Sequence, residues 1–297
     1  MKIFNFKKID AFATRNSDGN PAGYIKLDSI NDITDKEMLK IAQELKGYVN
    51  EVGYVFQVDK STYKLRYFSS EKEVEFCGHA TIAIMYDIIK NDNELIKKSE
   101  VNIVTNKGNL VVQNRIEDED AVFIMSPIPE FNSKKVSKEE VANALKTKIS
   151  DIDNEPEIVN AGLETLIVSI KSLGTILNLK PKLEELKEFC VKNKIDIIEV
   201  FCAEVANLKN AYRTRVFAPT FGYLEDPATG SGNSAFGYYL LKHKNWDGKI
   251  ISIEQCGEKE RYTIVKLKTY KDNNRFERVL FGGGAVVRIE GKYFYYK

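Results

Sequence analysis

An α+β fold built from two related halves is the fold class that this sequence predicts. Segments typical of strands outnumber those typical of helices, and groups of strands separate the helices, which favours α+β over a doubly wound sheet. The chain has 297 residues, more than a typical single domain of roughly 100–200 residues. Short motifs of the first half also recur in the second half, which indicates a duplication.

In the first half, a capping box and a glycine turn begin the two expected helices. Thr34-Asp35-Lys36-Glu37 has the form of a capping box, and apolar residues after it fall on one helix face. Gly78-His79 precedes a run that is apolar on nearly every side and ends near Lys90, which is typical of a helix surrounded by sheet. Strands are expected at residues 2–13, 22–27, 53–56, 63–68, 101–105, 109–114 and 121–125.

The second half follows a stretch with two prolines, Ser126-Pro127-Ile128-Pro129, which resists regular structure. We expect an N-terminal half of residues 1–118, which the C-terminal strand at 286–297 can join, and a C-terminal half of residues 119–285. Ser137-Lys138-Glu139-Glu140 is again a capping box. Helices are also expected at 182–193 and 233–242, with strands at 164–170, 197–202, 212–217, 249–255, 261–268, 278–281 and 284–296.

Two matching arrangements half a chain apart carry the evidence for duplication. Arg66-Tyr67-Phe68 precedes Gly78 and its apolar helix, and Arg215-Val216-Phe217 precedes Gly230 and its apolar helix. If the two halves are related by symmetry, both glycine turns can face one cleft. Free N–H groups at the start of each helix would attract an anion there, which suits a small molecule that carries a carboxylate.

Composition excludes several classes of protein. Lys+Arg 44 and Asp+Glu 43 give a net charge of +1, so neither nucleic acid nor an anionic membrane is an expected partner. The sequence contains neither the apolar core of a signal peptide nor an apolar run long enough to span a membrane. Four scattered cysteines without CxxC spacing indicate reduced thiols in a cytoplasmic protein, with neither disulfides nor a zinc site: Cys77, Cys190, Cys202 and Cys256.

The stretch Glu75-Phe76-Cys77-Gly78-His79-Ala80-Thr81 combines a cysteine, a glycine and one of only two histidines. A glycine at the start of a helix lets the backbone approach a ligand. A strand-to-helix turn with a buried cysteine and a capping histidine explains the same residues equally well. Taken alone, Glu51 would be a solvated carboxylate at the end of a helix.

Motifs spread over nearly the whole chain resemble the phenazine-biosynthesis isomerase (PhzF-like) family, whose fold is that of diaminopimelate epimerase. The most specific matches are Cys77-Gly78-His79-Ala80-Thr81 and, later in the chain, Glu225-Asp226-Pro227-Ala228-Thr229-Gly230-Ser231. Asp10-Ala11-Phe12, Gly19-Asn20-Pro21-Ala22 and Asn50-Glu51 also match. The resemblance implies two pseudo-symmetric halves, each a curved mixed sheet wrapped around a central helix, with the active site between them.

The same resemblance implies roles for individual residues. It implies that Glu51 is the catalytic acid/base and that the protein is a homodimer without a metal or redox cofactor. A carboxyl near aromatic residues such as Tyr54 and Phe56 can have a raised pKa and can both accept and return a proton near neutral pH. The residues implied to bind and polarise the substrate are Gly78, His79, Asp226, Gly230 and Ser231.

The sequence departs from the family pattern at two positions and leaves two alternative functions open. Val52 replaces a threonine common in the family, and Cys256 replaces a glycine. An amino-acid racemase or epimerase of the same fold would use two opposed thiols; Cys77 matches the first, but the second turn contains no cysteine. A non-catalytic ligand-binding protein would tolerate loss of Glu51, so the presence of Glu51 disfavours that function. The substrate itself is not evident from the sequence.

Overall fold

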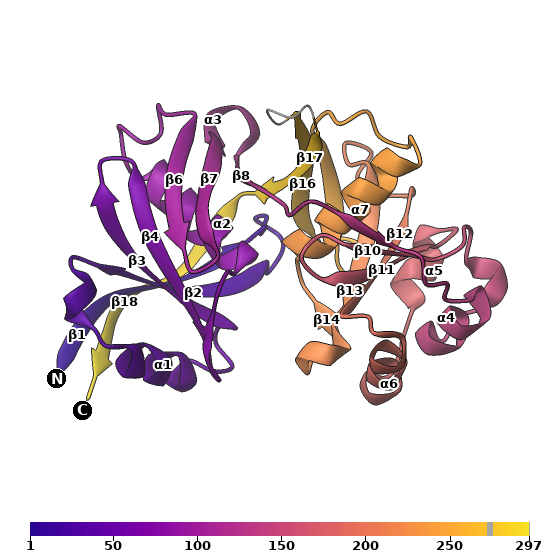
Figure 1. Ribbon diagram of the computed structural model, residues 1–297, viewed down its shortest axis with the longest axis horizontal. Coiled ribbons are helices and arrows are strands. Elements are labelled where there is room, and N and C mark those ends of the chain that lie inside the picture. The colour runs from indigo at the N-terminus through magenta and orange to yellow at the C-terminus, as the bar shows by residue number, and fades with distance from the viewer. Residues whose placement is uncertain (272–275, 297) are drawn as a thin grey trace. The chain divides into compact units, whose positions relative to one another are not determined.

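The computed structural model describes residues 1–271 and 276–296, and the chain divides into two compact units (Figure 1). The first unit comprises Met1–Met125 together with Gly282–Lys297, and the second comprises Ser126–Phe281. The sequence predicts a first half that ends at residue 118. In the structure β8 (Ala121–Met125) pairs with β7 (Gly108–Arg115), so the first unit includes this strand. Lys297, the last residue of the expected C-terminal strand, lies outside the described residues.

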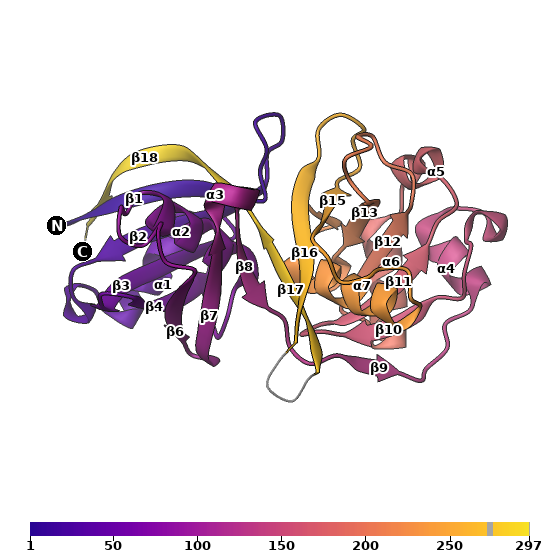
Figure 2. The same ribbon diagram turned by 90° about the horizontal axis from the view of Figure 1, so that it is seen from above.

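The first unit is a mixed sheet in which the C-terminal strand β18 pairs with the N-terminal strand β1 (Figure 2). From that edge the strands follow in the order β18, β1, β2, β3, β4, β6, β7 and β8. The pairs β2–β3 and β4–β6 are parallel, and the others are antiparallel. The bounds are β18 (Ala285–Tyr295), β1 (Lys2–Ala11), β2 (Asn20–Leu27), β3 (Glu51–Asp59), β4 (Thr62–Ser69), β5 (Glu73–Val74, paired with β4) and β6 (Glu100–Thr105).

Helix α2 (Gly78–Lys90) is the central helix of the first unit. It contacts β1, β2, β3, β8 and β18, and every residue from Ala80 to Ile89 is buried. The helix approaches β3 so closely that any side chain on Gly53 would collide with Ile84. The sheet therefore wraps around α2, as the all-round apolar sequence of this helix predicts.

Helix α1 (Asp35–Glu44) covers the opposite face of the first sheet. The expected capping box is present, because Thr34 accepts from the backbone N–H of Glu37 and Glu37 accepts from that of Thr34. The apolar side of the helix packs against Tyr54 of β3, whose hydroxyl donates to the carbonyl of Met38 at 2.8 Å. Two short helices complete the unit, η1 (Ile30–Asp32) and α3 (Ile116–Glu119).

The second unit is a mixed sheet of the same construction around α7 (Gly230–Lys242). Helix α7 contacts β10, β11, β12 and β16, while α4, α5 and α6 pack through apolar residues on the other sheet face. The strands are β9 (Glu130–Asn132), β10 (Glu157–Asn160), β11 (Glu164–Ser169), β12 (Ile197–Cys202), β13 (Tyr212–Phe217), β14 (Glu225–Asp226), β15 (Ile251–Gln255), β16 (Thr263–Lys271) and β17 (Glu277–Gly283). The other helices are α4 (Lys138–Leu145), η2 (Ile149–Asp151), α5 (Leu173–Asn178), α6 (Leu183–Asn193) and η3 (Pro219–Phe221).

Strand pairing confirms the expected duplication. In the first unit a parallel pair (β2–β3) leads into an antiparallel pair (β3–β4), a two-residue strand (β5), the central helix and a second parallel pair (β4–β6). The second unit repeats this order with β11–β12, β12–β13, β14, α7 and β13–β15. The two-residue strands and α5 are too short to be recognised from sequence periodicity.

The start of α7 differs from the sequence prediction. The predicted helix begins at residue 233, but the observed helix begins at Gly230. Gly230-Ser231-Gly232 has poor helix propensity, which led to the later start. The observed helix nevertheless includes these residues, and position 230 needs glycine, because a side chain there would collide with the ring of Phe281. Within residues 1–271 and 276–296, no helix is long and apolar enough to cross a membrane.

Candidate active site

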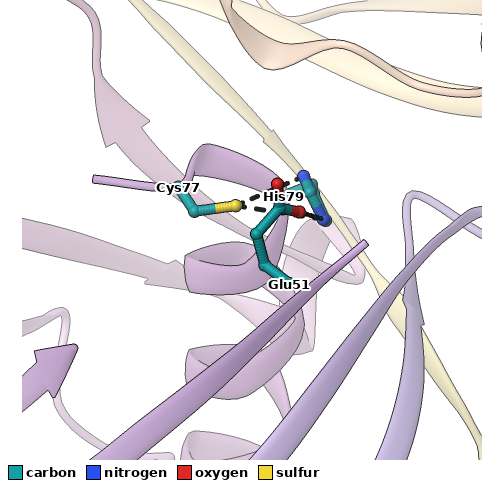
Figure 3. A group of neighbouring side chains, drawn as sticks. All are labelled: Glu51, Cys77 and His79. Carbon is teal, nitrogen blue, oxygen red and sulfur yellow. Dashed lines mark hydrogen bonds and ion pairs between the residues drawn. The ribbon is translucent and has the colours of Figure 1, made fainter. Parts of the chain in front are cut away.

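Glu51, Cys77 and His79 form one cluster in the first unit (Figure 3). The imidazole Nε2 of His79 lies 3.2 Å from Oε2 of Glu51. The sulfur of Cys77 lies 3.4 Å from Nδ1 of the same ring. The structure therefore brings the predicted acid/base residue together with His79, and it adds Cys77 as a direct neighbour of the imidazole.

The start of α2 is held in place by hydrogen bonds to the residue before it. Cys77 occupies the N-cap position, and its carbonyl accepts from both the backbone N–H (3.0 Å) and the hydroxyl (2.7 Å) of Thr81. The hydroxyl of Tyr67 on β4 lies 2.6 Å from the hydroxyl of Thr81. This chain of contacts joins the sheet to the first turn of the helix and fixes where Gly78 and His79 lie.

Glu51 is the first residue of β3, and strand alternation determines its surroundings. Glu51 and Gly53 face α2, whereas Val52 and Tyr54 face α1. The expectation that Tyr54 and Phe56 surround Glu51 is therefore wrong, because both aromatic side chains belong to the core on the opposite face. The same alternation places Val52, the first departure from the family pattern, away from Glu51.

The carboxylate of Glu51 contacts His79 through one oxygen and remains partly exposed. Oε2 of Glu51 is buried, and among the described residues it has no hydrogen bond of good geometry, so its contact with His79 is an ion pair. The Glu51 side chain as a whole is 22% exposed. A partly exposed carboxylate beside an imidazole is positioned to exchange protons with a bound molecule.

Opposing effects set the pKa of His79. Burial alone would lower the pKa of His79, but negative charge on Cys77 and on Glu51 outweighs burial and raises that pKa well above its ordinary value. Burial raises the pKa of the Cys77 thiol above its usual range. The contacts with Cys77 and Glu51 thus favour the charged imidazole, whereas burial favours the neutral thiol.

The cluster also contains three residue types that bind metals. The nearest donor atoms of Glu51, Cys77 and His79 all lie within 4.8 Å of one another. Carboxylate, thiolate and imidazole are ligands of zinc. Ligand spacing along the chain does not reveal this group, because Glu51 comes from a strand and the other two residues come from a helix start.

In the second unit the matching turn is held by Gln255 of β15. Its Oε1 accepts from the N–H of Thr229 (3.0 Å), and its Nε2 donates to the carbonyl of Asp226 (2.8 Å). The hydroxyl of Thr229 donates to the carboxylate of Asp226. Asp226 is buried, and its carboxylate contacts the side chain of Thr229, the residue before Gly230 and Ser231.

Sequence reasoning missed the part played by Gln255 and by a buried glutamate, Glu199 of β12. The signal at Gln255 is a weak resemblance of Glu254-Gln255 to the family pattern. Glu199 had a clearer one, because a charged residue interrupts the apolar run Ile197-Ile198-Glu199-Val200-Phe201. Its position next to α7 follows only from the tertiary structure.

The second departure from the family pattern, Cys256, has an unusual backbone. Its φ is +153°, in a region that favours glycine. The carbonyl of Cys256 accepts a hydrogen bond from Arg213 at 3.1 Å. The glycine usual in the family would adopt this conformation without strain, whereas Cys256 adopts it with a side chain.

Comparison with known proteins identifies the family. Residues 9–291 match the family described as phenazine biosynthesis-like protein, PhzC-PhzF. An uncharacterized isomerase of Clostridium acetobutylicum is 32% identical over 298 residues, 97% of each chain. A Bacillus anthracis phenazine biosynthesis protein of the PhzF family superposes with a TM-score of 0.86 at 26% identity, covering 99% of this chain and 100% of that one.

This chain belongs to the PhzC-PhzF family. A hydroxyproline epimerase of Agrobacterium vitis shares the fold, with a TM-score of 0.61 at 12% identity over 99% of this chain and 91% of that one. The fold class expected from the sequence, pseudo-symmetric halves of the epimerase type, is thereby confirmed.

Proposed function

We propose that this protein is an isomerase that moves a proton, and with it a double bond, on a small carboxylated metabolite, without a metal or redox cofactor. The observation that carries the proposal is the contact between Glu51 and His79. Family membership and relatives named as isomerases support the reaction class. The substrate class, catalysis by Glu51 and independence from cofactors are parts of the proposal that go beyond family membership.

In this proposal Glu51 accepts a proton from a carbon of the substrate and returns it to another carbon. A single residue that performs both transfers moves the proton along one face of the substrate. In the substrate-free protein, His79 holds the carboxylate of Glu51 in position and compensates its charge. When Glu51 becomes protonated, the imidazolium can turn its N–H toward negative charge that develops on the substrate.

The starts of α2 and α7 are the proposed contacts for substrate carboxylates. Gly78-His79 and Gly230-Ser231 lie in first turns, where backbone N–H groups have no acceptor within the helix. Such N–H groups and the positive end of the helix dipole favour an anion. Asp226 would act on the substrate through this turn, since its carboxylate already accepts from Thr229.

A thiol-dependent epimerase is the second candidate function, and the position of Cys77 beside His79 favours it. Two observations count against it. The residue at the N-cap of α7, which matches Cys77, is Thr229, and the pKa of Cys77 is raised by burial. Replacement of Cys77 by serine separates the two functions: retention of activity supports Glu51 as the base, whereas loss of activity with an intact fold supports the thiol.

Solvent deuterium exchange tests the proposal before the product is known. The protein is incubated with a panel of unsaturated and amino carboxylates in D₂O, and exchange at carbon is followed by NMR. We expect exchange with at least one compound, unaffected by chelators, and loss of exchange in Glu51→Gln. Glu75→Gln, the same change at an exposed residue of the neighbouring turn, is the matched control. Persistent exchange in Glu51→Gln contradicts the role of Glu51.

The homodimer implied by the family stays a prediction, which light scattering tests.

A further inference from the structure

Glu199 is a fully buried carboxyl group in the middle of β12. Its relative exposure is 0%, and neither carboxyl oxygen has a hydrogen-bond partner among the described residues. Glutamate is almost never fully buried unless it is paired. Neither solvation nor an ion pair therefore explains why a glutamate occupies this position.

Apolar side chains surround this carboxyl within the sheet. Ile167 of β11 and Val216 of β13 lie beside Glu199 in register, and Ile197 and Phe201 flank it on the same face of β12. A titratable group on that side of the sheet is Asp226, which pairs with Val216. The phenols of Tyr212 and Tyr239 pack on Phe201. Lys242 and His243 lie at the far end of α7, where both pair with Glu157. None of these groups is a cation beside Glu199.

The carboxyl points at the first turn of α7. A Cβ atom built on Gly232 would lie 2.5 Å from Oε2 of Glu199, so the carboxyl lies directly against the Cα of this glycine. Gly232 is the third residue of a helix of 13 residues and follows Gly230 and Ser231. The unpartnered carboxyl thus lies beneath the backbone N–H groups proposed to bind an anion.

The first unit lacks this carboxyl. Val52 pairs with Phe68 in the first unit, and Ile198 pairs with Phe217 in the second, so Glu199 corresponds to Gly53. At Gly53 the side chain of Ile84 fills the space. In the second unit the long side chain belongs to the strand, and it lies against Gly232, which occupies the helix position of Ala80 in the first unit. The pairing of a buried carboxyl with a glycine of the helix is therefore specific to the second unit.

We propose that Glu199 is a positioning residue that lets the first turn of α7 bind an anionic group only while its own carboxyl is protonated. An ionised carboxylate at this place would oppose the positive end of the helix dipole and repel an anion through a poorly screened interior. A neutral carboxyl leaves the N–H groups available. Burial raises the pKa of Glu199 well above its usual range, which keeps the group protonated near neutral pH. The inference rests on the proposed function, because it takes Gly230 and Ser231 as a ligand-binding turn.

Sulfate is a suitable probe, because its charge stays constant over the pH range of the experiment. Its affinity is measured from the backbone amide resonances of Gly230, Ser231 and Gly232 between about pH 6 and pH 9.5, the range in which buried glutamates titrate. For the unchanged protein we expect the affinity to fall about tenfold or more as the pH rises through the pKa of Glu199. In Glu199→Gln, a neutral isostere, the affinity should stay constant.

Glu199→Met provides a second neutral variant, and Glu164→Gln, which removes another buried carboxylate oxygen without a partner, is the matched control. Loss of a protonated-carboxyl infrared band in Glu199→Gln, but not in Glu164→Gln, would report the protonation state directly. The same pH dependence in Glu199→Gln as in the unchanged protein overturns the role of Glu199 and leaves the proposed function intact. Absence of sulfate from the turn at every pH overturns both this inference and the ligand-binding turn, while the exchange assay still tests Glu51 separately.

Discussion

Oε2 of Glu51 and Nε2 of His79 are 3.2 Å apart, although one residue begins a strand and the other lies in the first turn of a helix. This contact connects the two motifs on which the proposed chemistry depends. The parallel pairing of β2 with β3 fixes the strand, and the hydrogen bonds of Thr81 to Cys77 fix the helix start. Neither side chain needs a ligand to reach the other.

Replacement of Glu51 by glutamine should lower the turnover number about 10²–10⁴-fold, the usual contribution of a general acid/base. Glutamine keeps the size of the side chain but accepts no proton. Steady-state kinetics with a substrate found by deuterium exchange measures the effect, and Glu75→Gln is the control. A loss smaller than about tenfold would sink the assignment.

The ion pair of Glu51 and His79 should make stability depend on pH in a defined direction. Because the folded protein raises the pKa of His79, the stabilisation is complete below the unfolded pKa of about 6.5 and is lost as the pH rises through the folded pKa. Glu51→Gln should therefore lower the free energy of unfolding at about pH 6 by about 1 kcal/mol, and the difference should shrink at higher pH. Urea unfolding at several pH values checks this. A difference that grows with pH contradicts the pair.

Glu199 should also make stability fall as the pH rises, because its pKa is raised in the folded protein. In the unfolded chain the carboxyl ionises above about pH 4.3, while in the folded protein it keeps its proton to higher pH because burial raises its pKa. The unchanged protein should therefore lose stability as the pH rises through this interval. Glu199→Gln should match it at about pH 4 and exceed its stability at about pH 8. Equal slopes for both proteins in urea unfolding would contradict a protonated Glu199.

Gly232 and Glu199 should show a strong energetic coupling. Gly232→Ala places a methyl group 2.5 Å from Oε2 of Glu199, and such overpacking typically costs about 1–3 kcal/mol. In a Glu199→Ala background the same change should cost less or become favourable, since alanine exceeds glycine in helix propensity by about 1 kcal/mol. A double-mutant cycle from urea unfolding measures the coupling. Gly174→Ala, in a helix where the nearest atom would be 3.9 Å away, is the control.

The ion pair of Arg213 and Glu254 should be worth more than an exposed pair. Both side chains are 0% exposed, and Arg213 also donates to the carbonyls of Cys256, Glu258 and Lys259. Glu254→Gln should destabilise the protein by about 3–5 kcal/mol, because it leaves a buried guanidinium without its counter-charge. Glu94→Gln, which removes an exposed pair with Lys97, should change stability by less than about 1 kcal/mol. Thermal unfolding of both variants compares the two, and similar values would refute the expectation.

Much of the fold could be predicted from the sequence, because its determinants are local. The capping boxes at Thr34 and Ser137 correctly begin α1 and α4, and the strands at 121–125 and 212–217 have the predicted bounds. The apolar runs after Gly78 and Gly230 indicated two central helices and thereby the duplication. The motif around Glu51 and His79 also named the pair of residues that the structure brings into contact.

Other features depend on which residues meet across the fold, and local patterns do not encode such meetings. Strand alternation turns Tyr54 and Phe56 away from Glu51. The start of α2 instead brings Cys77 into the cluster with Glu51 and His79. The close approach of Phe281 explains why α7 begins at a glycine with poor helix propensity. Glu199 was visible in the sequence only as a charge in an apolar strand. Its burial without a partner, against Gly232, was decided by the packing of α7 on the sheet, because only packing determines which groups are removed from water.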